Sequence, residues 1–194
     1  MASHAQTRRM ISYAQNGEDV VLDRFFASPQ GFYIDVGANH PVYESVTKYF
    51  YDIGWRGISI EPDPARFGML CQDRPEDVNL RTAVAAASGE QALHLIPNTG
   101  LSTLRADIAG QWSERGYFSQ PMPTPASTLA EICRQHAPEV IDFLKIDVEG
   151  AEGDVIRGGD WRAFRPRVVV VEAVHPLDGT PTWTDWESLL EGYV

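Results

Sequence analysis

Cysteine is scarce in this chain of 194 residues, which contains only Cys71 and Cys133. Two cysteines make no disulfide framework, and both fall in helix-like segments. We therefore expect reduced, partly buried thiols. The fold must be stabilised by an apolar core, for which a chain of this length and 43% hydrophobic content suffices.

Long apolar runs and an excess of basic residues are also missing. No run of 18 apolar residues exists, so we predict no transmembrane helix. The arginines near the N-terminus precede no apolar stretch of the kind found in secretory signals, which favours a cytoplasmic protein. A net charge of -11 argues against nucleic acid as a partner, because phosphate binding requires a basic face.

Helix-like and strand-like segments alternate along the chain, a pattern typical of an α/β domain with a mostly parallel sheet. We predict one domain over residues 1–194, with residues 1–11 as a flexible terminus. The last strand, 167–174, is the most apolar, so we place it at the buried centre of the sheet. The expected strands cover residues 32–36, 57–62, 79–86, 92–97, 140–150 and 167–174.

Two parts of the chain depart from this regular alternation. Residues 98–125 contain three glycines and three prolines, and we interpret them as an irregular loop or lid over a binding site. Near the C-terminus, Thr184 and Glu187 predict a capped helix. No strand follows that helix, so the strands that usually complete such a sheet are missing. An exposed sheet edge of this kind predicts a homo-oligomer or a longer polypeptide.

The first candidate site combines a glycine turn with two carboxylates. Asp35 and Gly37 end the strand 32–36, and Glu61 ends the next strand, 24 residues after Gly37. An acidic residue at about this separation binds the two hydroxyls of a ribose. The glycine-rich phosphate motif of dinucleotide sites is missing, and Asp35 would repel a phosphate. S-adenosylmethionine, which has a sulfonium and an ammonium group, fits better than NAD.

A second carboxylate-rich turn follows the strand 140–150. Lys145, Asp147 and Glu149 alternate and therefore point to one side, so Lys145 can form an ion pair with a neighbouring carboxylate. Glu172 ends the following strand, and His175 comes three residues later. A histidine or one of these carboxylates could act as general base for a hydroxyl. The carboxylates could also hold a divalent cation, although we do not predict one.

Five segments in a fixed order resemble the FkbM-type methyltransferase family. They are SYAQNGEDVVL (12–22), FYIDVGAN (32–39), GWRGISIEPD (54–63), GLSTL (100–104) and IDFLKIDVEGAE (141–152). The segment GANHPVYESVTKYFYDIGWRGISIEP (37–62) is most similar to family members that occur with glycosyltransferases in surface-polysaccharide pathways. The resemblance spans about residues 12–176.

This resemblance implies a Rossmann-like class I methyltransferase fold, S-adenosylmethionine as donor, and O-methylation of a hydroxyl, with a saccharide or other small molecule as acceptor. It also implies that the segment around Tyr13 folds over the cofactor tail. The candidate cofactor residues are Tyr13, Gln15, Asp19, Asp35, Gly37, Asn39, Glu61, Pro62, Ser102 and Asp147. The candidate catalytic residues are Lys145, Asp147, Glu149 and His175. The alternatives are an NAD-dependent oxidoreductase and a non-catalytic cofactor-binding module that scaffolds polysaccharide assembly.

Overall fold

The computed structural model describes residues 10–193 of the chain. The predicted flexible terminus therefore lies largely outside the described residues. The helices are α1 (Glu18–Phe26), α2 (Lys48–Asp52), α3 (Pro64–Asp73), α4 (Ala106–Glu114), α5 (Leu129–His136), α6 (Glu152–Arg157) and the 3-10 helices η1 (Trp183–Asp185) and η2 (Glu187–Leu190). The strands are β1 (Phe32–Val36), β2 (Arg56–Ile60), β3 (Val78–Leu80), β4 (Ala83–Val84), β5 (Gly89–Leu95), β6 (Gln120–Ser127), β7 (Phe143–Ile146) and β8 (Val168–Val171).

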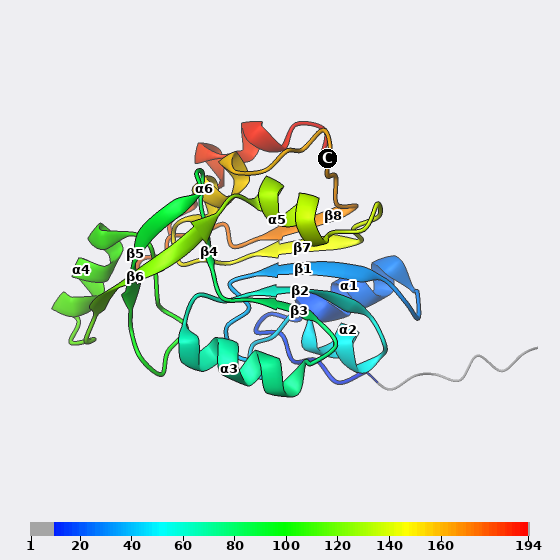
Figure 1. Cartoon of the computed structure of the whole chain (residues 1–194), viewed down its shortest axis with the longest axis horizontal. Helices are drawn as coiled ribbons and strands as arrows, with labels where there is room; N and C mark the ends of the chain where they lie inside the picture. Colours follow the sequence, from blue (N-terminus) through cyan, green and yellow to red (C-terminus); the bar gives the residue numbers. More distant parts are fainter. Residues whose placement is uncertain (1–9, 194) are drawn as a thin grey trace, which may run out of the picture.

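A parallel sheet of five strands forms the centre of the molecule, in the order β3-β2-β1-β7-β8 (Figure 1). The chain builds outward from β1 through β2 to β3, and returns to add β7 and β8 on the other side of β1. The strand order thus reverses between β1 and β7. Open parallel sheets bind ligands at such a reversal, outside the carboxyl ends of the strands.

Helices cover both faces of this sheet, because β1 directs apolar side chains alternately to each face. Ile34 and Val36 pack in one core cluster with residues of α5 and α6. Tyr33 packs on the opposite face with Phe50 of α2 and Leu22 of α1. This sandwich confirms the predicted α/β fold with a mostly parallel sheet and flanking helices.

A second sheet, with the order β4-β6-β5, extends to one side of the main sheet and carries α4 at its outer end (Figure 1). Strand β5 pairs antiparallel with β6 over the whole length of β5, whereas β4 and β6 pair parallel. The predicted strand 79–86 is therefore split, since β3 lies in the main sheet and β4 in the second one.

The prediction of an irregular lid over 98–125 was wrong. This segment forms helix α4 and most of strand β6. Pro121, Pro123 and Pro125 lie opposite His94, Ala92 and Glu90 of β5. They occupy alternate positions of β6, so their missing N–H groups fall on one edge of the strand. Residues 98–105 and 115–119 remain as loops, and residues 99–104 of the first loop line the cavity described below.

The C-terminal predictions also need correction. Strand β8 is not the central strand but lies at the edge of the sheet, and its four residues are only half-buried. The predicted helix at Thr184 is replaced by η1 and η2, and no side chain caps either of them. Cys133 is buried as expected, whereas Cys71 is exposed. Within residues 10–193, no helix is long and apolar enough to cross a membrane.

Candidate functional site

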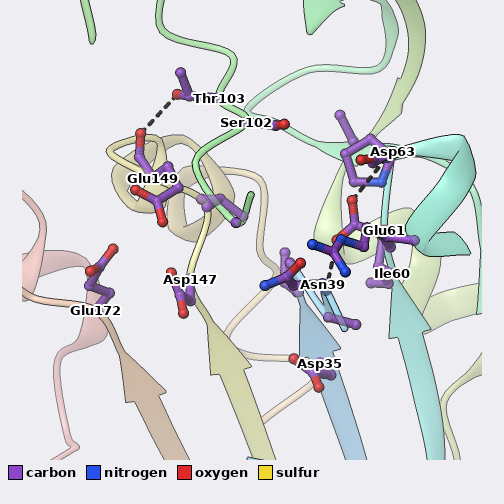
Figure 2. Close-up of a pocket in the computed structure, with 18 of the residues that line it drawn as sticks. Asp35, Asn39, Ile60, Glu61, Asp63, Ser102, Thr103, Asp147, Glu149 and Glu172 are labelled. Carbon is purple, nitrogen blue, oxygen red and sulfur yellow. Dashed lines mark hydrogen bonds between the residues drawn. The ribbon is translucent and has the colours of Figure 1, made fainter. Parts of the chain in front are cut away.

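A cavity of about 300 Å³ opens at the carboxyl ends of the central strands, beside the reversal between β1 and β7. Its volume lies at the lower end of the range for small-molecule sites. Figure 2 shows that four neighbouring strands each bring a carboxylate to this edge. Asp35 lies on β1, Glu61 follows β2, Asp147 follows β7 and Glu172 follows β8.

The turn after β1 can be formed only with glycine at its first position. Gly37 has φ +75°, and a Cβ atom there would lie 1.8 Å from the carbonyl oxygen of Asp147. The N–H groups of Gly37 and Ala38 both donate to Ile60 O, at 3.0 and 3.1 Å. Gly37 therefore lets β1, β2 and the turn after β7 approach one another closely at the floor of the cavity.

Glu61 is buried and receives one backbone hydrogen bond on each carboxylate oxygen. Asn39 N donates to Oε2 and Asp63 N donates to Oε1, both at 2.8 Å (Figure 2). Burial raises the pKa of Glu61 to about 7, although these two hydrogen bonds partly oppose the rise. The carboxylate is thus fixed in orientation while each oxygen keeps an unused lone pair.

Lys145 provides a buried positive charge at the site. Its Nζ donates to Gly37 O at 2.7 Å and lies 3.4 Å from both Asp35 Oδ1 and Asp147 Oδ2. Burial disfavours the charged ammonium, but Asp147 and Asp35 outweigh it and raise the pKa of Lys145. The sequence allowed an ion pair of Lys145 with Asp147 or Glu149; Asp147 forms it, and Asp35 shares the same lysine.

Three carboxylates gather at the other end of the cavity. Asp147, Glu149 and Glu172 each offer one oxygen, and these oxygens lie within 4.8 Å of one another. Burial, followed by Asp147 and Glu152, raises the pKa of Glu149 to about 8. Burial, followed by Asp147 and Glu149, raises the pKa of Glu172 to about 9. The cluster can hold protons near neutral pH, and its oxygens are also of the type that binds Mg²⁺ or Ca²⁺.

The loop 98–105 borders the cavity opposite the strand ends. Ser102 Oγ accepts a hydrogen bond from Ile96 N, and Thr103 Oγ1 donates to Glu149 O at 2.8 Å. Glu149 itself has φ +56°, an uncommon conformation for a residue other than glycine. The second sheet is thus joined to the turn after β7, so both sheets contribute to the cavity wall.

Residues 35–194 of the chain match the family model of the methyltransferase FkbM domain. The chain belongs to the FkbM methyltransferase family. It is also similar to the methyltransferase sdnD of Sordaria araneosa, with 28% identity over 191 residues that cover 82% of this chain and 71% of the relative. No solved structure matched the chain. The resemblance stated from the sequence motifs is confirmed, and the parallel sheet agrees with a Rossmann-like methyltransferase fold.

Most of the site residues predicted for an FkbM methyltransferase line this one cavity. They come from segments far apart in the sequence, which the parallel sheet brings to a single edge. The lining includes Gln15, Asp35, Gly37, Asn39, Glu61, Pro62, Ser102, Lys145, Asp147 and Glu149.

Three predicted residues are not among the lining residues. Asp19 is fully buried in the first turn of α1, where it accepts hydrogen bonds from Ser12 Oγ and Tyr13 N. Tyr13 packs against the core cluster on the α1 and α2 face of the sheet. His175 lies in the loop after β8, and its Nδ1 is 3.3 Å from Asp178 Oδ1. These positions favour structural roles for all three residues.

Sequence reasoning missed several residues of the cavity. Arg66 follows Glu61 by five residues on α3 and lines the cavity, where its Nη2 donates to Thr99 O at 3.4 Å. Leu93 and Leu101 supply apolar wall from the second sheet and its loop. Arg66 could have been predicted from the sequence, because it is a basic residue in the first turn of the helix that follows Glu61, the candidate ribose-binding acid. No pattern in the sequence predicts that the two leucines line the cavity, because this depends on how the second sheet packs against the first.

Proposed function

We propose that this FkbM methyltransferase binds S-adenosylmethionine in the cavity and methylates a hydroxyl oxygen of a saccharide or glycoconjugate. The geometry of the Glu61 carboxylate is the main support for this proposal. Its two oxygens are held in place by Asn39 N and Asp63 N, and their remaining lone pairs suit two adjacent hydroxyl donors. A ribose presents two such hydroxyls.

Charge at the floor of the cavity favours a donor without phosphates. Asp35 is buried and its Oδ1 accepts no hydrogen bond among the described residues, although Lys145 lies 3.4 Å away. An anionic pyrophosphate beside this carboxylate would be repelled, whereas an ammonium or sulfonium would be attracted. The turn after Gly37 also lacks further glycines. Both features disfavour the NAD-dependent alternative.

Bound S-adenosylmethionine supplies a methyl group on a positively charged sulfur, which leaves with the electron pair of the broken carbon–sulfur bond. The chain must bind and orient an acceptor hydroxyl and remove its proton. We assign proton removal to Glu149, whose pKa of about 8 lies close to neutral pH. Asp147 and Lys145 position the acceptor, and His175 receives no role because it lies outside the lining.

The outer part of the cavity supports a hydroxyl-rich acceptor. Glu149 and Glu172 provide acceptor oxygens there, and Ser102 and Thr103 lie on the opposing loop. Saccharides present many hydroxyl donors to such oxygens. The cavity volume of about 300 Å³ holds little more than a nucleoside. A saccharide acceptor would therefore bind at the open side of the cavity.

Transfer of a radiolabelled methyl group tests the proposal. The chain is incubated with methyl-labelled S-adenosylmethionine and a panel of sugar nucleotides and oligosaccharides, and the products are separated and cleaved. We expect label in an O-methyl sugar together with an equal amount of S-adenosylhomocysteine. Label on nitrogen or carbon would contradict O-methylation. Binding of the donor without turnover on any acceptor would favour the non-catalytic module.

A further inference from the structure

A buried arginine lies beneath the cofactor end of the cavity without touching the cavity itself. Arg74 is fully buried at the end of α3. Its Nη2 donates to Pro41 O at 2.6 Å and to Ser45 Oγ at 2.5 Å, and its Nη1 donates to Thr47 Oγ1 at 2.5 Å. All of these acceptors are neutral oxygens. A buried guanidinium is costly unless a negative charge lies close by.

Two buried carboxylates lie near Arg74: Asp77, whose raised pKa it partly lowers, and Asp35, which is one hydroxyl group away. Thr47 Oγ1 lies 2.6 Å from Asp35 Oδ2, and Thr47 is itself fully buried. An arginine has no acceptor, so Thr47 must accept from Arg74 and must use its own proton to donate to Asp35. The direction of both hydrogen bonds is therefore fixed along the path Arg74–Thr47–Asp35.

The fixed direction leaves Oδ1 as the Asp35 oxygen that Thr47 does not bind, and Asp35 lines the cavity. Oδ2 is occupied by Thr47, which sets the plane of the carboxylate. Oδ1 is buried, accepts no hydrogen bond among residues 10–193, and lies 3.4 Å from Lys145 Nζ. An unsatisfied buried carboxylate oxygen has a strong preference for a donor from a ligand.

We propose that Arg74 acts through Thr47 as a positioning residue, which presents Asp35 Oδ1 to the ammonium group of the methyl donor's amino-acid tail. This inference rests on the proposed function. Neither Arg74 nor Thr47 is among the lining residues, so Thr47 reaches the cavity through Asp35, and Arg74 reaches it through Thr47 and through Ser45, which lines the cavity. The loop from Pro41 to Ser45 is held by the same guanidinium, which couples the shape of the turn after β1 to the orientation of Asp35.

The simpler alternative is that Arg74 only anchors this loop. Loop anchoring would affect every ligand of the cavity in the same way. Positioning of Asp35 would affect only ligands that carry the amino-acid tail. S-adenosylhomocysteine and 5′-methylthioadenosine separate the two roles, because they share the adenine, ribose and sulfur but only the first has the ammonium group.

The experiment is calorimetric titration of the whole chain and its variants with these two nucleosides. Thr47→Val removes the hydroxyl at nearly constant volume, and Thr47→Ser restores it. Arg74→Lys keeps the buried positive charge but loses the fork of two donor groups. Thr124→Val is the matched control, since Thr124 is also buried and its hydroxyl donates only to Met122 O, in the second sheet.

We expect Thr47→Val to weaken binding of S-adenosylhomocysteine about tenfold or more while binding of 5′-methylthioadenosine stays within about twofold. Arg74→Lys should show the same selectivity, and it carries the test if Thr47→Val does not fold. Thr47→Ser and Thr124→Val should bind both nucleosides like the wild type.

Equal weakening of both nucleosides in Thr47→Val and Arg74→Lys would overturn the inference in favour of loop anchoring. Unchanged binding of both would overturn it as well. Failure of the wild type to bind either nucleoside is a separate result, which would contradict the proposed function and remove the inference with it.

Discussion

The backbone N–H of Asn39 donates to Glu61 Oε2 across 2.8 Å, which ties the turn after β1 to the end of β2. Asp63 N holds the other oxygen of the same carboxylate at the same distance. The orientation of Glu61 is therefore set before any ligand arrives. Preorganised acceptors of this kind lose little entropy on binding.

Removal of Glu61 should weaken binding of the methyl donor. Glu61→Ala deletes the acceptors proposed for the ribose hydroxyls, and we expect affinity for S-adenosylhomocysteine to fall by one to two orders of magnitude, about 1.4–3 kcal/mol. Calorimetry measures the change. Glu90→Ala, at an exposed position of β5, is the control and should bind as wild type. Wild-type affinity in Glu61→Ala would show that the ribose lies elsewhere.

Gly37→Ala should severely destabilise the fold. The new Cβ would lie 1.8 Å from Asp147 O, and φ is +75°. We expect a loss of at least about 3 kcal/mol, because positive φ and a backbone clash act together. Gly110→Ala is the matched control. It lies in α4 with no atom within 4 Å of the new Cβ, and should stabilise the chain by up to about 1 kcal/mol. Urea unfolding compares the two variants.

Stability should fall as pH rises through the neutral range. Burial raises the pKa of Glu61 to about 7, of Glu149 to about 8 and of Glu172 to about 9. The folded chain therefore holds these protons more tightly than the unfolded chain, whose carboxyls titrate near 4.5. Their stabilising contribution is complete below about pH 4.5 and is lost between about pH 5 and 9.

Glu172→Gln tests this pH dependence, because the amide is neutral at every pH. We expect the melting temperature of the wild type to fall by on the order of 5 °C between pH 6 and pH 9, and the variant to show a flatter slope. Thermal unfolding followed by circular dichroism gives both curves. A wild-type melting temperature that rises across this range would contradict the assignment of protons to the carboxylate cluster.

Asp19 should contribute to stability rather than to cofactor binding. Its carboxylate accepts hydrogen bonds from Ser12 Oγ, Tyr13 N and Val20 N, which fix the chain before α1. We expect Asp19→Ala to lower the free energy of unfolding by roughly 2–3 kcal/mol and to leave affinity for S-adenosylhomocysteine unchanged. Asp52→Ala, which removes only an exposed ion pair with Lys48, should cost less than about 0.5 kcal/mol. Lost affinity in folded Asp19→Ala would restore its predicted cofactor role.

The cofactor end of the site was accessible to sequence reasoning because its signals are local. Asp35 and Gly37 directly follow apolar strand residues, and Glu61 directly follows β2. Parallel strands bring their carboxyl ends to one edge, so the cluster could be expected without coordinates. Lys145 and Asp147 followed from the same rule and from the need to pair a buried charge.

The remaining features depend on relationships between distant segments. The apolar sequence of β8 predicts a central strand, yet β8 lies at the edge of the sheet. The chain adds β7 beside β1 first, and β8 then pairs on the outer side of β7. Strand β6 was not predicted because it contains three prolines. They are compatible with a strand here because β5 pairs along one edge of β6 and their missing N–H groups fall on the other edge. The hydrogen bond between Arg74 and Thr47 joins residues 27 positions apart, and neither residue belongs to a motif.

The most direct test of the central claim is calorimetric titration of the wild-type chain with S-adenosylmethionine, S-adenosylhomocysteine and NAD. The account predicts dissociation constants on the order of micromolar for both sulfur nucleosides and no measurable binding of NAD. Binding of NAD instead, or binding of none of the three, would contradict the assignment of the cavity beside Gly37 and Glu61 to a methyl donor.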